Sequence, residues 1–195
     1  MSDTRERIVE ATSALFMQQG YSATGLKAIA EAGEATTGSL YHFFPGGKAE
    51  LAAATLRHSG AAYERLVAAI WDAEPDPVSA VEACFRGAAE VLRSTDYVDA
   101  CPIATVALEV ASSDEDLRLV TAEVFASWHG AILERLTAAG IGEPRSEELA
   151  TVLVAGLEGG FLLSRAAKDA SRLEVIGEAM VRLVEDALSS APVRA

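Results

Sequence analysis

Apolar residues recur at intervals of three and four along most of the chain, which is the period of an amphipathic helix. Near the start, Ile8, Leu15 and Phe16 share one such stripe, and Gly20 follows it as a C-cap glycine. This pattern predicts a first helix over residues 4–19. No segment alternates convincingly between apolar and polar residues, so we expect an all-α protein.

Two shorter helical segments follow. Thr24 is placed to cap a helix over residues 25–32, and Thr36 is placed to cap another over residues 36–43. The three residues from Gly33 to Ala35 join them as a tight turn. Two short helices joined in this way, the second with a polar exposed face, predict a helix-turn-helix.

Proline, glycine and N-cap residues divide the rest of the chain into six longer helices. Pro45 ends the second short helix, and Gly46-Gly47 form a hinge before a long helix. Further on, Pro102 stands at the first position of a helix. The six helices are expected over residues 48–72, 77–94, 102–112, 115–139, 145–168 and 172–189. With the three before them, these make a nine-helix fold.

Composition supports this fold, whereas charge complicates the functional interpretation. Half of the 195 residues are hydrophobic, which allows a substantial core, but the formal net charge of −13 argues against a nucleic-acid partner. Residues 1–50 carry four basic and six acidic side chains, so most of the excess charge lies after them. A near-neutral head can bind DNA through a few placed contacts, with weak non-specific affinity and a modest salt dependence.

Several classes of protein are disfavoured. Cys84 and Cys101 have no metal-like spacing with the histidines and form no disulfide scaffold. Gly46-Gly47-Lys48 lacks the upstream glycine and the following Ser or Thr of a phosphate loop. The N-terminus shows no apolar signal region, and Leu149–Ser164, interrupted by Glu158, is too short to cross a bilayer. We expect a cytoplasmic protein that uses no metal or cofactor and is not an enzyme.

The second short helix carries the candidate chemistry. Its hydroxyls, with the Tyr-His pair that follows them, make poor core material but suit contact with a hydrogen-bonding surface such as DNA. An ordinary capped surface helix is the alternative. The candidate DNA-binding residues, including backbone contacts from the preceding helix and from the start of the long helix, are Thr24, Lys27, Thr36, Thr37, Gly38, Ser39, Tyr41, His42 and Lys48.

The segment from Thr24 to Leu51, and GSLYHFFPGGK within it in particular, resembles the DNA-binding half of the TetR family of bacterial regulators. The body segments ACPIA from Ala100 and ALE from Ala107 resemble the YxaF/LmrA-type branch of that family. The chain departs from many members in having Glu34 at the turn, where Gly33 would supply the permissive backbone instead, and Thr37 in place of a lysine.

The resemblance implies a helix-turn-helix DNA-binding domain over residues 1–47 and a helical ligand-binding and dimerisation domain over residues 48–195. It implies a third helix in the major groove, a small-molecule pocket in the body and a homodimer formed by the last two helices. An apolar pocket with a polar anchor would draw on Trp71, Phe85, Cys101, Phe125, Trp128, Glu158 and Phe161.

Each of these body residues has an alternative role. The aromatic side chains can simply pack in the core, and Glu158 can face water or a partner subunit. Cys101 precedes a helix start, where a thiol can become reactive, but a buried structural cysteine is the simpler interpretation. His129 is expected to be a hydrogen-bonded histidine rather than a ligand contact.

The last two predicted helices show an interface pattern. Three glycines thin one face of the first, which favours close approach of another helix, and the second carries an apolar stripe. Packing within one chain is the alternative to a dimer. The candidate interface residues are Gly156, Gly159, Gly160, Ile176, Met180 and Leu183.

These patterns together predict a homodimeric DNA-binding transcriptional regulator, most simply a repressor that releases a pseudo-palindromic operator when a small molecule binds. Two rivals stay open. One is a regulator that responds through Cys101, and the other is a helical small-molecule-binding protein or enzyme that does not bind DNA. Regulation of an efflux or detoxification gene is what the resemblance implies.

Overall fold

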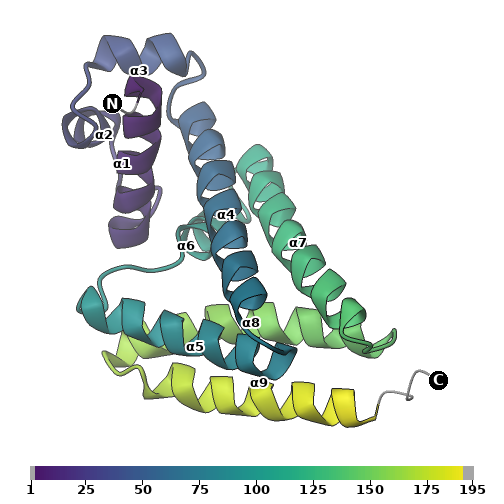
Figure 1. The fold of residues 1–195 in the computed structure, drawn as a ribbon. Helices are drawn as coiled ribbons and strands as arrows, with labels where there is room; N and C mark the ends of the chain where they lie inside the picture. The colour runs from purple at the N-terminus through teal and green to yellow at the C-terminus, as the bar shows by residue number, and fades with distance from the viewer. Residues whose placement is uncertain (1–2, 191–195) are drawn as a thin grey trace. The chain divides into compact units, whose positions relative to one another are not determined.

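The computed structural model describes residues 3–190, and within that range it contains nine α-helices and no strand. The predicted all-α class, helix number and helix order are confirmed, with helix ends within two residues of those expected. The helices, labelled as in Figure 1, are α1 Thr4–Gln19, α2 Leu26–Ala32, α3 Thr37–Phe43, α4 Gly47–Ala73, α5 Pro77–Ser94, α6 Pro102–Val110, α7 Glu115–Ala138, α8 Arg145–Ala167 and α9 Ser171–Ser189.

The chain forms two compact units. The first comprises Met1–Ala62 and Asp99–Val124, and the second comprises Tyr63–Val98 and Phe125–Ala195. The helices α4 and α7 contribute their N-terminal parts to the first unit and their C-terminal parts to the second. The helix α6 thus belongs to the same compact unit as α1–α3. The predicted boundary between a DNA-binding domain ending at residue 47 and a ligand-binding domain starting at residue 48 stays a prediction.

The first unit contains the three helices of the helix-turn-helix region, α1 to α3 (Figure 1). Ile8 from α1, Ile29 from α2 and Leu40 from α3 are almost completely buried together, because each lies on the apolar face of its helix. Phe44 and Leu51 close the same cluster from the chain that leads into α4. The apolar stripe predicted to include Ile8 is buried, and Leu40 holds α3 so that its opposite face is exposed.

The helix ends in this unit correct two expectations. Thr36 caps α3 as predicted, since its hydroxyl accepts a hydrogen bond from the Ser39 N–H at 3.0 Å. Thr24 does not cap α2: Gly25 is the N-cap, and the Thr24 hydroxyl donates to the Gly20 carbonyl at 2.6 Å. Thr24 does not cap the helix because its hydroxyl is hydrogen-bonded to a backbone carbonyl of the α1–α2 turn.

The turn between α2 and α3 also differs from expectation. Glu34 itself adopts the left-handed conformation, with φ of 48°, whereas Gly33 has φ of −85°. Gly33 is needed for space instead, because a Cβ there would lie 3.2 Å from Ile8 Cα and from the Ile29 carbonyl oxygen. Gly33 therefore does not supply the permissive backbone; it lets α2 approach α1.

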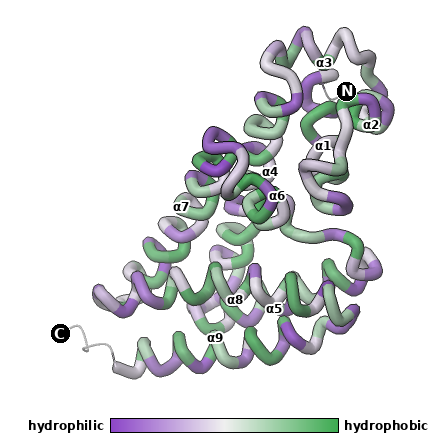
Figure 2. Tube along the Cα trace, turned by 180° about the vertical axis from the view of Figure 1, so that it is seen from behind, coloured by the Kyte–Doolittle hydropathy of each residue, from purple (hydrophilic) through white to green (hydrophobic). Residues whose placement is uncertain are grey.

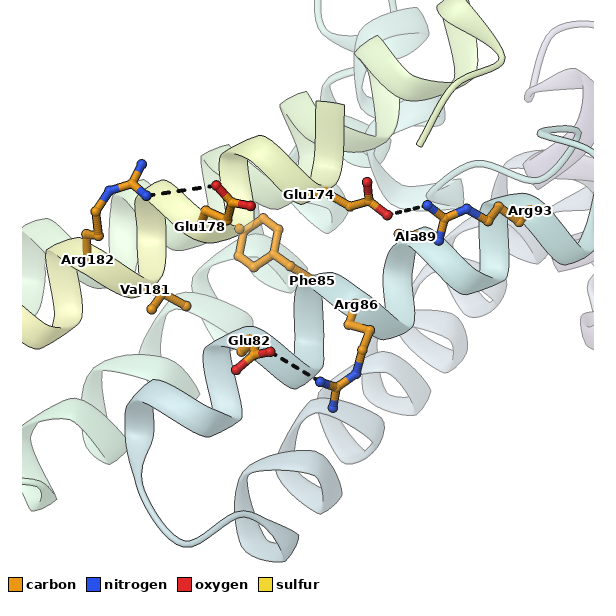
Figure 3. A pocket seen from close by; sticks show the side chains of 10 residues that line it. Glu82, Phe85, Arg86, Ala89, Arg93, Glu174, Glu178, Val181 and Arg182 are labelled. Atoms are coloured by element: carbon orange, nitrogen blue, oxygen red, sulfur yellow. Dashed lines mark hydrogen bonds and ion pairs between the residues drawn. The ribbon is translucent and has the colours of Figure 1, made fainter. Parts of the chain in front are cut away.

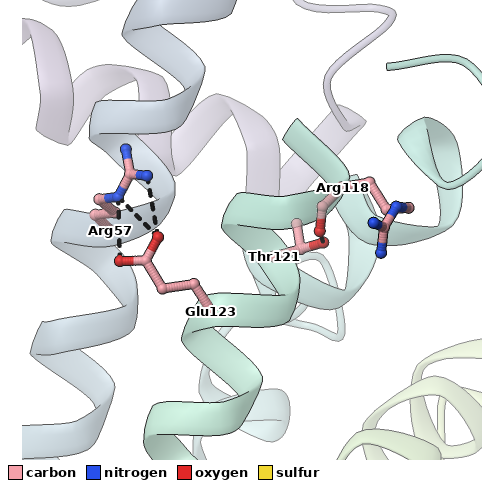
Figure 4. A network of polar contacts seen from close by, with 4 residues as sticks. All are labelled: Arg57, Arg118, Thr121 and Glu123. Atoms are coloured by element: carbon pink, nitrogen blue, oxygen red, sulfur yellow. Dashed lines mark hydrogen bonds and ion pairs between the residues drawn. The ribbon is translucent and has the colours of Figure 1, made fainter. Parts of the chain in front are cut away.

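Within the first unit, the N-terminal parts of α4 and α7 pack closely. A Cβ on Gly60 would lie 2.5 Å from Val124 Cγ1, so the two helices meet where α4 has no side chain. Beside this contact, the Arg57 guanidinium donates to both carboxylate oxygens of Glu123 (Figure 4), with Nη2 to Oε2 at 3.0 Å. Both side chains are about half exposed or more, so the ion pair adds little stability.

The second unit is built on α5, α8 and α9, which run side by side (Figure 1). Hydrophobic and polar positions interleave along α5 and α9 (Figure 2), and the apolar side chains meet in one core that includes Phe85, Leu92, Leu153 and Leu173. Phe85 and Leu173 are buried because the glycines opposite them, Gly177 and Gly160, leave room. The glycines thus serve close packing between helices of one chain.

The helix α8 runs without interruption, as its predicted range of 145–168 requires, and it is longer than the apolar segment Leu149–Ser164 that was expected to be too short to cross a bilayer. It has 23 residues, its most apolar 18-residue window has a mean hydropathy of 1.4, and it is the one helix among residues 3–190 long and apolar enough to cross a bilayer by those measures. Glu158 and the glycines do not end it, since each keeps its place in the helix. Only 28% of its most apolar window is buried within the chain, so an apolar surface is left uncovered.

Candidate DNA-binding face and effector cavity

The exposed face of α3 is formed as predicted. Thr36, Thr37 and Gly38 are exposed, as are Tyr41, with 52% of its surface accessible, and His42. Leu40 points the other way into the core, so the polar residues share one side of the helix. The sequence of α3 contains no acidic residue, and its surface offers hydroxyl, phenol and imidazole groups that can donate hydrogen bonds.

Two α3 hydroxyls are already engaged with each other. The Thr36 and Ser39 oxygens are 3.0 Å apart, and Ser39 is partly buried. Because hydroxyls can donate and accept at once, both retain capacity for a further hydrogen bond. Gly38 has only the Thr36 hydroxyl near the place of a Cβ, at 3.6 Å, so the backbone of α3 is open to close approach.

The remaining predicted DNA contacts fall into three situations. Lys27 is exposed on α2, as expected for a residue that contacts the DNA sugar-phosphate backbone. Thr24 is completely buried and its hydroxyl is bonded within the turn, so the structure does not present this side chain to a ligand. Lys48 is partly buried at the start of α4, where its ammonium lies 4.2 Å from the centre of the Tyr21 ring.

The α1–α2 turn, whose Tyr21 ring contacts Lys48, makes a further contact that the sequence did not predict. The N–H groups of Tyr21 and Ser22, in the α1–α2 turn, donate to the two carboxylate oxygens of Glu109 on α6 at 2.9 and 2.7 Å. Gly20 precedes them with φ of 81°, and a Cβ there would collide with Glu109 Oε1. The only sequence indication was the ALE segment, whose family resemblance marked Glu109 without showing what it contacts.

The electrostatics of this cluster follow from its geometry. Burial opposes ionisation of Glu109, but the hydrogen bonds from Ser22 and Tyr21 and the charge of Lys48 outweigh it, so the pKa of Glu109 is lowered. Burial lowers the pKa of Lys48, and Glu109 partly offsets this effect. Burial and the neighbouring acids Asp114 and Glu109 raise the pKa of Tyr21, so its phenol stays neutral.

In the second unit, two of the predicted effector residues line one small apolar cavity. Trp71 and Phe85 meet there, and Cys84, whose thiol hydrogen-bonds with Trp71, lies between them. Burial raises the pKa of Cys84 to about 11, so the thiol is protonated and inert. The cavity has about 40 Å³ and carries no charged lining residue; its other walls are Val67, Val81, Ile132, Leu153 and Leu157.

A larger groove of about 460 Å³ opens between α5 and α9 (Figure 3). Its floor is apolar, with Phe85 and Val181, and its rim carries three arginine–glutamate pairs. Since each guanidinium faces a carboxylate, the rim is electrically balanced. This groove has a charged rim and differs from the apolar pocket with a polar anchor that the sequence predicted.

The other predicted effector residues do not line this cavity and lie in separate parts of the fold. Phe161 packs on the same core as Phe85, whereas Phe125 and Trp128 form a separate aromatic group with Tyr63, with ring centres 5.5 and 6.0 Å apart. Glu158 is partly buried on α8. Cys101 belongs to the first unit, where its buried thiol stands at the N-cap of α6.

The candidate for a polar core histidine is hydrogen-bonded. His129 Nε2 lies 3.1 Å from the Thr151 hydroxyl and 3.7 Å from a Glu147 carboxylate oxygen. This supports the predicted role of a hydrogen-bonded side chain. Among residues 3–190, no cluster of three or more His, Cys, Asp or Glu side chains could hold a metal ion.

Comparison with known proteins decides the family. Residues 77–179 match the C-terminal domain of LmrA/YxaF-like transcriptional regulators, and residues 8–55 match the bacterial regulatory proteins of the tetR family. The chain belongs to the TetR family. It is a helix-turn-helix transcriptional regulator of the LmrA/YxaF-like branch, as the motifs indicated.

Similar TetR-family proteins cover nearly the whole chain. The HTH-type regulators YxaF and LmrA of Bacillus subtilis are 37% and 34% identical, covering 93% and 88% of this chain and 95% and 91% of their own. The regulatory protein TetR of Rhodobacter sphaeroides has a TM-score of 0.83 at 21% identity, over 93% of this chain and 99% of its own.

One neighbour was crystallised with DNA. A cysteine mutant of the TetR-family regulator CifR, in a structure that includes 26-bp double-strand operator DNA, has a TM-score of 0.77 at 23% identity. The match covers 90% of this chain and 94% of that one. At this identity the likeness establishes the shared TetR fold.

Proposed function

We propose that this TetR-family regulator is a cytoplasmic, non-enzymatic homodimer that represses transcription by binding a pseudo-palindromic operator, and that a small molecule releases it. The observation that carries the proposal is the exposed, acid-free face of α3, where Tyr41 and His42 stand beside hydroxyls on a helix fixed by its buried opposite side. Such a helix fits the major groove, with side chains reaching bases and phosphates.

The DNA contacts are assigned to predicted residues whose side chains are exposed or only partly buried. Thr36, Thr37 and Ser39 would contact bases or phosphates, while Tyr41 and His42 would contact phosphates; Lys27 and Lys48 would add contacts from α2 and α4. The buried Thr24 would act only by shaping the turn. With so few cations, binding would depend modestly on salt and rest on placement.

The test is titration of a promoter fragment from the chain's own locus. Tyr41→Ala should weaken binding, and Tyr41→Phe should show how much of that affinity depends on the phenol hydroxyl. Val91→Ala, a substitution at an exposed residue of α5, should leave the affinity unchanged. Removing one phosphate contact should also lower the salt slope by up to about one unit. Undiminished affinity of Tyr41→Ala would remove Tyr41 from the DNA contacts, and an unshifted wild-type titration would refute the proposal.

The second copy of the chain would cover the exposed apolar stripe of α8. Val152, Leu162 and Leu163 are 40%, 61% and 53% exposed, and Gly159 has open space beyond it. These residues recur on one side of the helix, whereas Gly156 and Gly160 already pack against Ile176 and Leu173 of the same chain. Of the three glycines first proposed for the interface, Gly159 therefore fits best, since Gly156 and Gly160 serve intramolecular packing.

Dimerisation is tested by sedimentation. Leu162→Arg should shift the protein toward monomer and weaken operator binding, because a buried charge in an apolar interface is costly. Leu119→Arg on α7 is the matched control, since Leu119 is also about half exposed. If both variants sediment as the wild type does, α8 is not the interface, and vesicle flotation would then test whether lipid covers it instead.

The effector would enter the second unit at the cavity lined by Trp71, Cys84 and Phe85. Its lining favours an apolar, uncharged molecule, and its 40 Å³ holds little more than one water, so binding must widen it. A thermal-shift screen with apolar compounds tests this: a true effector raises the melting temperature and weakens operator binding. The rival thiol mechanism is disfavoured, because the Cys101 side chain is only 7% exposed.

A further inference from the structure

The α1–α2 turn of the head is held by a residue from outside the helix-turn-helix. Glu109 on α6 accepts two hydrogen bonds from consecutive backbone N–H groups, those of Tyr21 and Ser22, at 2.9 and 2.7 Å. Because the acceptor is charged, these bonds are stronger than neutral ones. Gly20 leaves the space that the carboxylate occupies, so the turn is shaped around Glu109.

The same turn sets the position of a cation that faces the operator in the proposed function. The Tyr21 ring packs edge-on against Phe16, with centres 5.8 Å apart, and carries the Lys48 ammonium 4.2 Å from its own centre. Phe16 is completely buried, so the ring rests on the core of the unit. Moving the backbone of Tyr21 would move the ring and with it the place where Lys48 is held.

We propose that Glu109 is a positioning residue for DNA binding: by fixing the Tyr21–Ser22 backbone, it sets the Tyr21 ring and through that ring the Lys48 ammonium. All the groups lie in the first compact unit. The inference rests on the proposed function, in that it takes Lys48 to meet a DNA phosphate. In this proposal α6, which does not itself contact DNA, helps to hold the DNA-binding face in place.

Charge alone predicts the opposite effect of losing Glu109. The protein has a net charge of −13, and removing any carboxylate near the DNA side should reduce repulsion and strengthen binding. Positioning predicts that the loss of this carboxylate weakens binding. The sign of the change therefore separates the two explanations.

The experiment compares Glu109→Ala and Glu109→Gln with Glu115→Ala in operator titrations at several salt concentrations. Glu115 is an exposed acid of the same unit, paired with Arg118 on its own helix. Glu109→Ala should weaken binding about fivefold, the scale of one cation–π contact, and lower the salt slope by about one. Glu115→Ala should bind equally or more tightly with an unchanged slope. Glu109→Gln keeps the shape and one acceptor, so it should lie between wild type and Glu109→Ala.

A double-mutant cycle with Lys48→Met distinguishes positioning from general support of the fold. If Glu109 acts through Lys48, Glu109→Ala should have little further effect in the Lys48→Met background. An equal loss in both backgrounds, or a Glu109→Ala variant that binds as Glu115→Ala does, overturns the inference. Should Glu109→Ala lose its helical circular dichroism, the cycle is run with Glu109→Gln. A wild type that does not bind the operator refutes the proposed function instead.

Discussion

Gly177 on α9 offers a sharp test of how the second unit is packed, because two opposing effects meet there. Replacing it with alanine favours the helix, since glycine in a helix interior is about 1 kcal/mol less stable than alanine. The new Cβ, however, would lie 2.7 Å from Cβ and 3.1 Å from Cγ of Phe85 on α5. The nearer atom, Cβ of Phe85, is fixed by the backbone, so a rotamer change cannot move it away.

The steric cost should exceed the propensity gain. Overpacking of a closely packed core typically costs about 1–3 kcal/mol, and here the backbone of α5 or α9 must shift. Because the backbone must shift, we take the upper half of that range and expect Gly177→Ala to lose a net of about 1–2 kcal/mol, which lowers the melting temperature by about 2–8 °C in a protein of this size. The cavity beside Phe85 should change shape as well, so effector binding should be altered.

Gly87 on α5 is the matched control. It is a helix-interior glycine of the same unit, and no atom lies within 4 Å of the place that a Cβ would take, so Gly87→Ala should gain the propensity term alone. Thermal and urea unfolding at one fixed protein concentration compare the two, because dimer dissociation would otherwise contribute. A Gly177→Ala protein as stable as Gly87→Ala would show that the α5–α9 approach is looser than described and would refute the reasoning.

Two further predictions concern titration. The pKa of folded Glu109 is lowered, so its contribution to stability is present above its unfolded pKa and is lost as the pH falls; between about pH 6 and pH 3.5, wild type should lose more unfolding free energy than Glu109→Gln, and parallel losses would contradict this. The pKa of Cys84 is raised to about 11 by burial, so iodoacetamide should label it about a hundredfold more slowly at pH 8 than a solvent-exposed thiol. Peptide mass spectrometry follows the labelling, and equal rates would disprove the burial.

The helices were predictable because their boundaries depend on local chemistry. Gly20 ends α1, Thr36 caps α3 and Pro102 opens α6, each through conformational preferences that operate within a few residues. The polar face of α3 was equally predictable from the sequence, since a stripe opposite the buried Leu40 follows from helical periodicity. The family motifs GSLYHFFPGGK and ALE added the functional class.

The errors arose where one residue could serve more than one partner. Thr24 was predicted as a cap and a DNA contact, but its hydroxyl closes the turn; Gly33 was expected to take the left-handed conformation that Glu34 adopts. Gly156 and Gly160 were predicted at a dimer interface, which stays a prediction; within the chain, their missing side chains make room for α9. A thinned helix face shows that something approaches closely, but it does not show what.

The sequence alone determined the all-α class, the nine helices found among residues 3–190 and the hydroxyl-rich face of α3, because periodicity, caps and breakers are properties of neighbouring residues. Tertiary structure decided which distant groups meet: Glu109 with the turn after Gly20, and Lys48 with the Tyr21 ring. The first of these contacts joins residues nearly ninety positions apart, and no local preference encodes such a pairing. It arises only when the buried faces of α1 and α6 are brought together in one unit.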